Sequence, residues 1–436
     1  MMNSSKKLIL IDWLLPMDGG RPIRKAYLLI EKGLIKDFGL QVQLSSEGDC
    51  LEQNLIIEKL PGGILMPGLI NTHIHLAYKT TALDDCQDEI DWLKKIVQES
   101  RSMTQKDKIS LAKENVKAVL KGGCTFVVEN TPFDETVEAI AESRLKALLG
   151  IEVFGNKSSQ AEMVFQNSLA KLKSLEEKFQ SVTPRLQFTF SPHSIYNVAD
   201  SLMQLLSVWA KQNDRFLLLH LAEFAFESEL TQEHKLPAKL LDLYNLLGVT
   251  GSEIANKKNT LAAMNPVQYL KEIQCLHKKM VLTHLINVSE EDIKTLKESD
   301  ALLALCLRSN LLLHKKIPPS SLFRSTSSQI SFGTDGLSSN YDLDLIHEIS
   351  HNFKLLKANG LDASSQSLFE SITSIPAAKL GLKMGAIKRG NPADLLCFVP
   401  NSKESQKELS EKNIFDYLLE ELSNFTRQVW VDGESI

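Results

Sequence analysis

Strand-like and helix-like segments alternate through the centre of the chain. Between short apolar runs, segments such as 108–121, 136–145 and 289–297 place apolar residues at helical spacing. Such a repeat predicts an α/β chain folded as a (β/α)8 TIM barrel, in which parallel strands are buried. A doubly wound open sheet is the alternative that this rhythm leaves open. The eight apolar runs are 64–75, 125–130, 147–154, 186–190, 216–220, 280–284, 302–306 and 330–332.

The two ends of the chain have a different pattern. Residues 1–63 contain strand-like segments separated by turn residues, and residues 384–436 contain two more. Because a stretch of this size buries little core alone, we expect both termini to form one small β-sandwich domain beside a barrel domain at 64–383. The long connection 224–279 has no role that the sequence reveals. The strand-like segments are 8–15, 26–30, 55–58, 385–398 and 428–431.

Composition limits the partners and the compartment. With 43% hydrophobic residues and a net charge of −5 over 436 residues, we expect an ordinary soluble globular protein with a sizeable core. This charge argues against nucleic acid or an anionic membrane as a partner. Six cysteines without CxxC spacing fit a reducing compartment, and Asp12 interrupts the apolar run that resembles a signal peptide. We therefore expect a cytoplasmic protein, with a homodimer as one assembly open to it.

Residues of metal-ligand type stand at the ends of several predicted strands. His73 and His75 end the first strand, His220 the fifth and His284 the sixth, and Asp335 follows the eighth. Side chains two apart on a strand point the same way, so His73 and His75 would project together. The C-terminal ends of barrel strands are where active sites form. The sequence therefore predicts a metal site at this end of the barrel.

These residues belong to motifs that resemble the amidohydrolase superfamily, in its branch of cytosine-deaminase-like and chlorohydrolase-like enzymes. The resemblance implies that His73, His75, His220 and Asp335 hold one divalent metal ion, zinc or alternatively iron. No second metal is implied, because Thr189-Phe190 stands on the fourth strand where a bridging lysine would be. The motifs are Pro67–His75, Ser191–Ser194, His220–Glu223, Thr283–His284, Arg308–Asn310 and Gly333–Gly336.

The same resemblance implies catalytic roles. His284 would orient the hydroxide that the metal generates, and Glu223 would carry a proton to a ring nitrogen of the substrate. Asp335 would take the water's proton and pass it to departing ammonia. His193, in a Pro-His-Ser motif, would contact the substrate. The remaining histidines are predicted to be surface or packing residues: His234, His277, His314, His347 and His351.

Three further segments resemble aminofutalosine deaminases: 91–93, 306–312 and 333–340. This implies deamination of the purine nucleoside 6-amino-6-deoxyfutalosine, in a futalosine route of menaquinone biosynthesis. Arg308 and Arg101 are the candidates to pair with its carboxylate, and Trp92 would stack on the purine or cap its site.

Other interpretations stay open within and beyond catalysis. The chain departs from many relatives at Leu305-Cys306-Leu307, and the sequence assigns no role to Glu129-Asn130 or Glu152. Deaminases of S-adenosylhomocysteine, methylthioadenosine, adenosine or guanine, and chlorohydrolases, would use the same metal site. A scaffold without catalysis is the alternative of a different kind.

Overall fold

The computed structural model describes most of the chain, which divides into two compact units. The first unit comprises residues 1–71, 117–126 and 344–436, and the second comprises 72–116 and 127–343. Within the described ranges, no helix combines the length and apolar character that crossing a bilayer requires. The described residues are 6–44, 55–81, 86–131, 133–182, 185–232, 238–246, 264–361, 363–402 and 409–436.

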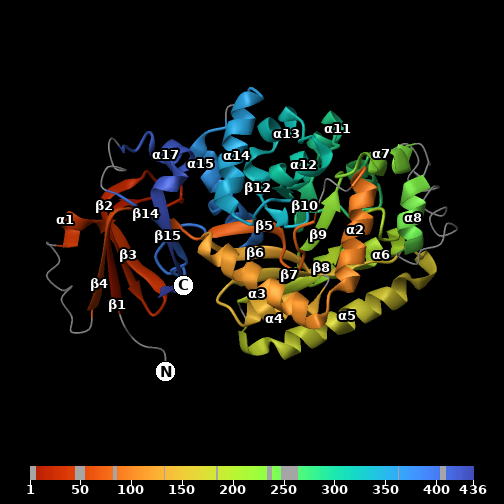
Figure 1. The fold of residues 1–436 in the computed structure, drawn as a ribbon, viewed down its shortest axis with the longest axis horizontal. Helices are drawn as coiled ribbons and strands as arrows, with labels where there is room; N and C mark the ends of the chain where they lie inside the picture. The colour runs from red at the N-terminus through yellow and green to blue at the C-terminus, as the bar shows by residue number, and fades with distance from the viewer. Residues whose placement is uncertain are drawn as a thin grey trace. The chain divides into compact units, whose positions relative to one another are not determined.

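The first unit contains a seven-stranded sheet in the order β16-β15-β14-β4-β1-β2-β3 (Figure 1). Strands β1 and β4 are parallel, whereas the other neighbours are antiparallel. Both chain ends contribute strands, as predicted, and their apolar side chains form a common core that includes Ile9, Leu28 and Trp430. The strands are β1 Lys6–Leu14, β2 Ile23–Glu31, β3 Leu34–Leu40, β4 Leu55–Pro67, β14 Leu395–Pro400, β15 Phe425–Val431 and β16 Glu434–Ser435.

The second sheet has nine strands in the order β12-β11-β10-β9-β8-β7-β6-β5-β13. From β5 to β12 the strands lie in chain order, and two residues, Gly333 and Thr334, separate β12 at one edge from β13 at the other. This curled, TIM-like arrangement brings the end of the eighth predicted strand beside β5, through the parallel pair β13–β5. The strands are β5 Leu69–His75, β6 Cys124–Thr131, β7 Lys146–Val153, β8 Leu186–Pro192, β9 Leu217–Leu221, β10 Met280–His284, β11 Leu302–Leu305, β12 Ile330–Phe332 and β13 Asp335–Gly336.

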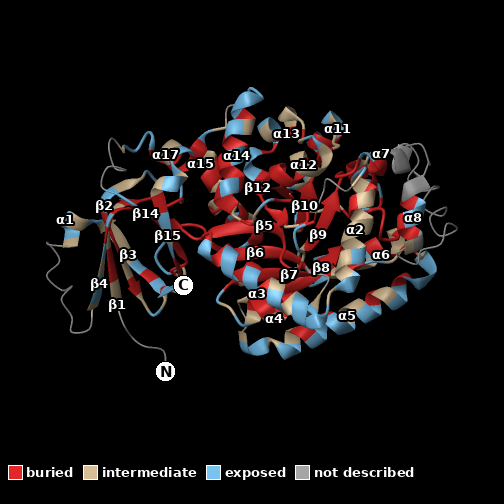
Figure 2. Ribbon diagram, viewed as in Figure 1, coloured by how far each residue is buried: buried red, intermediate tan, exposed pale blue. Residues whose placement is uncertain are grey.

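Helices between these strands pack on the sheet by their apolar faces. In particular, α4 contacts β7, α5 contacts β7 and β8, and α6 contacts β8 and β9. Figure 2 shows these strands buried, while α5 keeps an exposed outer face. The helices of the second unit are α2 Glu89–Ser102, α4 Asp134–Ala141, α5 Ala161–Lys178, α6 Asp200–Gln212, α7 Ala225–Gln232, α8 Ala238–Leu246, α10 Pro266–Glu272, α11 Glu290–Ser299, α12 Leu307–His314 and α13 Ser320–Ser325.

The remaining helices are α3, which both units share, and those of the first unit. Helix α3, Gln105–Lys121, matches the predicted segment 108–121. The predicted long connection contains α7, α8 and α10, and its segments 233–237 and 247–263 lie outside the described residues. The helices of the first unit are α1 Gln41–Leu44, α14 Leu345–Ala358, α15 Ser365–Glu370, α16 Ser374–Leu380 and α17 Ile414–Glu420.

Some predicted strand bounds were wrong. The apolar run 64–75 is two strands, because β4 continues to Pro67 in the first sheet and β5 starts at Leu69 in the second. The run is buried on both sides of Gly68, so periodicity alone gives no boundary. The prediction missed β3, and in the segment 385–398 only the part from Leu395 onward is a strand. The predicted domain boundaries at 63 and 383 and the sandwich arrangement stay predictions.

Candidate metal centre

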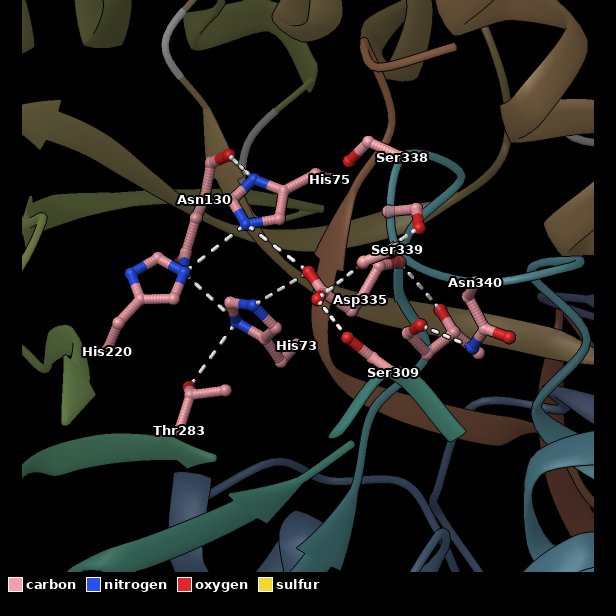
Figure 3. A network of polar contacts seen from close by, with 12 residues as sticks. His73, His75, Asn130, His220, Thr283, Ser309, Asp335, Ser338, Ser339 and Asn340 are labelled. Atoms are coloured by element: carbon pink, nitrogen blue, oxygen red, sulfur yellow. Dashed lines mark hydrogen bonds and ion pairs between the residues drawn. The ribbon is translucent and has the colours of Figure 1, made fainter. Parts of the chain in front are cut away.

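The predicted metal-binding side chains meet at the C-terminal ends of the second sheet (Figure 3). His73 and His75 come from β5, His220 from β9 and Asp335 from β13, and all four are buried. The Nε2 atoms of His75 and His220 are 3.3 Å apart. Oδ1 of Asp335 lies 3.4 Å from Nε2 of His73 and 3.7 Å from Nε2 of His75. The structure thus brings together the four residues that the sequence proposed as ligands.

Hydrogen bonds on the far side of two rings determine which nitrogen faces the centre. Nδ1 of His75 donates to the carbonyl oxygen of Asn130, and Nδ1 of His220 donates to the carbonyl oxygen of His193, each at 2.9 Å. Burial lowers the pKa of both imidazoles, and that of His220 to about 4, so the rings are neutral. A neutral ring whose Nδ1 donates carries a lone pair on Nε2. Two acceptor nitrogens therefore face each other across 3.3 Å.

Asp335 is held so that one oxygen points at the histidines. Its Oδ2 accepts hydrogen bonds from Oγ of Ser309 and Oγ of Ser339, both at 2.7 Å. Burial raises the pKa of this carboxyl group. The hydrogen bond with His73 and the electrostatic effect of the surrounding histidines lower it by more, so the net pKa lies well below its usual range. An ionised Oδ1 thus adds a negative charge beside the two facing nitrogens.

The donor set fits a divalent cation. Ligand atoms about 2.1 Å from one ion at tetrahedral angles lie about 3.4 Å apart, close to the spacings between the Nε2 and Oδ1 atoms here. Neutral imidazoles and a carboxylate are the protonation states that metal binding requires. Partners behind each ligand orient it, as is usual in metal sites. His73, His75, His220 and Asp335 would hold the ion.

His284 and Glu223 lie beside these ligands. Nδ1 of His284 donates to Oδ1 of Asn310 at 2.9 Å, which turns Nε2 toward Oε1 of Glu223, 3.7 Å away. Burial raises the pKa of Glu223, but the charges of His284 and His314 and the hydrogen bond from His314 outweigh it, and the net pKa is lowered. Ligand-type atoms of His73, His220 and His284 also lie within 4.8 Å of one another. The predicted catalytic side chains therefore share one centre with the ligands.

Glu227 fixes the loop that carries Glu223. Its carboxyl group accepts hydrogen bonds from three consecutive backbone N–H groups: Ala222 at 3.0 Å, Glu223 at 2.8 Å and Phe224 at 3.0 Å. Asn287 donates from its side chain to the carbonyl oxygen of Glu223 at 2.7 Å. The backbone of Glu223 is thus held on both sides.

Four residues at the same strand ends have a strained backbone. Ala222, His284, Leu285 and Asp335 have φ of 53°, 72°, 53° and 58°, a region that side chains other than glycine rarely adopt. Such residues cost on the order of 1–3 kcal/mol each and persist where surrounding contacts over-determine them. Two of these residues, His284 and Asp335, belong to the predicted centre.

The predicted substrate-binding residues differ in their surroundings. The ring of His193 lies 4.9 Å from that of His220 and 4.9 Å from that of Phe154, which is 46% exposed. Trp92 is buried and donates from Nε1 to the carbonyl oxygen of Ser338 at 2.9 Å. His193 therefore borders the centre, whereas Trp92 contacts the segment three residues beyond Asp335.

The two arginines already have partners. Arg308 is buried and forms a two-point ion pair with Asp342, at 2.9 and 3.0 Å. Arg101, at the end of α2, donates to the carbonyl oxygen of Leu246 at 3.2 Å. A substrate carboxylate would have to replace Asp342 at the guanidinium of Arg308.

Two further residues beside the ligands were not among the predicted site residues. Asn130, given no role, binds His75 through its carbonyl oxygen and lies 3.0 Å through its amide from Nδ1 of His73. Its neighbour Glu129 accepts from the N–H of Leu76 with both oxygens. The available signal was position, because Asn130 stands at the end of the second predicted strand as the ligands do on theirs.

His314, expected as a surface or packing residue, has a buried side chain next to the centre. It is buried beside Glu223, with its Nε2 3.3 Å from Oε1. Its spacing of four from Asn310 places both on one face of α12, which is the signal that the sequence offered. His277 and His347 lie outside the centre, and His234 lies outside the described residues.

A buried set of histidines and a carboxylate at the strand ends of a TIM-like sheet defines a metal-dependent hydrolase. The chain belongs to the amidohydrolase family, which matches residues 64–434. Enzymes of this kind hydrolyse C–N bonds, and the predicted family is confirmed.

Individual proteins resemble the chain over most of its length. A 5'-deoxyadenosine deaminase of Methanosphaera stadtmanae is 24% identical over 387 residues, which is 86% of this chain and 81% of that protein. The structure of a zinc-bound adenosine deaminase from Xanthomonas campestris covers 99% of this chain and 92% of its own, with a TM-score of 0.79 and 22% identity. The structure of the aminofutalosine deaminase of Helicobacter pylori covers 99% of this chain and 100% of its own, with a TM-score of 0.73 and 21% identity. These structures share the fold.

Proposed function

We propose that this chain is a metal-dependent deaminase that hydrolyses the amino group of an adenine-type nucleoside and releases ammonia. The observation that carries the proposal is the meeting of the facing acceptors of His75, His220 and Asp335 with the buried carboxylate of Glu223. The first group would hold a cation, and the second would move a proton. The activity of the 5'-deoxyadenosine deaminase relative supports the choice of reaction.

The metal that we propose is zinc, with iron as the alternative. Imidazole and carboxylate ligands suit both ions, and the adenosine deaminase from Xanthomonas campestris contains zinc. When bound, such an ion lowers the pKa of a coordinated water and supplies hydroxide near neutral pH.

The reaction adds water at C6 of the purine and breaks the bond from C6 to the exocyclic nitrogen. Glu223, held by Glu227 and Asn287, would accept a proton from water and deliver it to the adjacent ring nitrogen. His284, fixed by Asn310, would orient the water. Asp335, fixed by Ser309 and Ser339, would take the second proton and pass it to the departing amine.

The particular nucleoside that we propose is 6-amino-6-deoxyfutalosine, in menaquinone biosynthesis, since the fold matches an aminofutalosine deaminase. A second candidate class is a nucleoside with an uncharged 5' substituent, such as 5'-deoxyadenosine or methylthioadenosine. The ion pair between Arg308 and Asp342 favours this class, because it already neutralises the cation that a substrate carboxylate would need. A closed barrel with a terminal sandwich, a cytoplasmic location and a homodimer complete the proposal.

A screen for ammonia release tests the proposal. The purified chain is stripped with a chelator, reloaded with zinc or iron, and given adenosine, 5'-deoxyadenosine, methylthioadenosine, S-adenosylhomocysteine, aminofutalosine and guanine. We expect release from at least one adenine-type nucleoside, dependent on the added metal. Stoichiometric metal without release from any of them would refute the proposed reaction. Release from guanine alone would replace the substrate class.

A further inference from the structure

A histidine lies between two carboxylates beside the metal centre. His314, at the end of α12, is 4% exposed in its side chain. Its Nδ1 is 2.7 Å from Oε1 of Glu89, the first residue of α2, and its Nε2 is 3.3 Å from Oε1 of Glu223. The side chain of Glu89 is 31% exposed, so this chain of three groups extends from the centre toward solvent.

The geometry determines the charge of the histidine. A carboxylate oxygen accepts, so each ring nitrogen that faces one must carry a hydrogen, and an imidazole with hydrogens on both nitrogens is a cation. Burial lowers the pKa of His314, but the hydrogen bonds and charges of Glu223 and Glu89 outweigh it and raise the pKa to about 9. The arrangement is therefore a buried cation between two anions.

Glu223 needs such a partner. Its backbone is fixed by Glu227 and Asn287, but a glutamate side chain keeps several rotatable bonds, and a buried carboxylate without a donor is costly. Within the described ranges, the hydrogen bond from His314 is the one that the structure gives to this carboxylate. His284, at 3.7 Å from the same oxygen, is beyond hydrogen-bond distance.

We propose that His314 and Glu89 are positioning residues for Glu223. His314 holds Oε1 of Glu223, which orients the carboxylate for proton transfer, and Glu89 holds His314 from the opposite side. This inference rests on the proposed function, in which Glu223 carries the proton.

Kinetics of the zinc-loaded chain test the inference. We expect His314→Ala to lower kcat roughly 10–100-fold with full zinc content and a KM changed by less than about threefold, because it misplaces a group that acts in the reaction. His314→Gln, which keeps a donor, should recover part of kcat. His277→Ala is the matched control, because His277 lies outside the centre, and it should leave kcat unchanged.

A double-mutant cycle separates positioning from packing. In the Glu223→Gln background, we expect His314→Ala to cause little further loss of kcat, because the group that it positions is gone. The inference would be overturned if the kcat loss of the double variant equalled the product of the two single losses. It would also be overturned if His314→Ala left kcat unchanged.

An NMR titration of the protein with labelled histidines tests the contacts of His314 with Glu89 and Glu223 independently of enzyme activity. We expect the ring of His314 to stay protonated above pH 8 in the wild type and to lose its proton at lower pH in Glu89→Gln. A neutral ring at pH 7 in the wild type would also overturn the inference. Absence of turnover by the metal-loaded wild type would overturn the proposed function instead, while the titration would still report the contact.

Discussion

The core of the terminal sheet and the strand ends of the second sheet are both buried, but with opposite chemistry. Ile9, Leu28 and Trp430 belong to a core made of apolar side chains. The strand ends bury His220 and Asp335 together with other ionisable groups. Burial of apolar area stabilises a fold by about 25 cal/mol per Å², whereas burial of charge costs free energy unless partners or a metal compensate. The first region therefore maintains the fold, and the second carries the chemistry at a cost in stability.

The largest effect that we predict concerns the strand ends of the second sheet, the polar region of this comparison. Asp335→Asn removes both a ligand charge and a proton acceptor, so we expect zinc content to fall together with kcat. The loss in kcat should exceed the 10²–10⁴-fold typical of one acid–base group. Elemental analysis and ammonia release measure the two quantities. Asp37→Asn, an aspartate of the terminal sheet that pairs with Arg389, is the control and should retain both. Full zinc in Asp335→Asn would contradict its role as a ligand.

The next prediction separates proton transfer from metal binding within the same region. Glu223→Gln keeps the shape of the side chain and removes its charge, so we expect kcat to fall about 10²–10⁴-fold while zinc stays stoichiometric. A near-normal kcat would refute the assignment of the proton carrier. Loss of zinc would show that the carboxylate also supports the ion.

The apolar region should respond in stability and not in chemistry. Leu28 is fully buried in the terminal sheet, so Leu28→Ala should lower the free energy of unfolding by about 2–5 kcal/mol. The folded protein should keep its KM and zinc content. Denaturant unfolding measures the change, and Leu40→Ala, at a leucine 43% exposed, should lie within about 0.5 kcal/mol of the wild type. A large change in KM for Leu28→Ala would contradict the claim that the terminal core affects stability and not chemistry.

The sequence predicted what depends on periodicity and on position along a strand. Each of the eight apolar runs overlaps a strand of the second sheet, and the ligands stand at or near the ends of these runs. The boundary at Gly68 was not predictable, because apolar residues on both sides serve two different sheets. Hydrophobic pattern reports burial, but it does not report which sheet a strand joins.

The partners of the site were harder to predict than the ligands. Asn130 contacts His75 through a carbonyl oxygen, which every residue possesses, so this part of its role leaves no trace in residue type. The contact of His314 joins α2, α12 and the loop after β9, which are far apart in sequence. The positive φ values of Ala222 and Asp335 have no signature in side-chain type. Such features follow from tertiary packing.

The smallest predicted effect concerns Arg308, where the polar region meets the substrate. Its ion pair with Asp342 is partly open to solvent, since the side chain of Asp342 is 39% exposed, and such pairs contribute modestly. If a substrate carboxylate replaces Asp342, Arg308→Met should raise KM for aminofutalosine about tenfold, or about 1.4 kcal/mol, and spare 5'-deoxyadenosine. Asp342→Asn should then lower KM for aminofutalosine, because it frees the guanidinium. Equal changes of KM on both nucleosides would mean that the ion pair of Arg308 and Asp342 shapes the site without recognising the substrate carboxylate. That result would favour nucleosides with an uncharged 5' substituent.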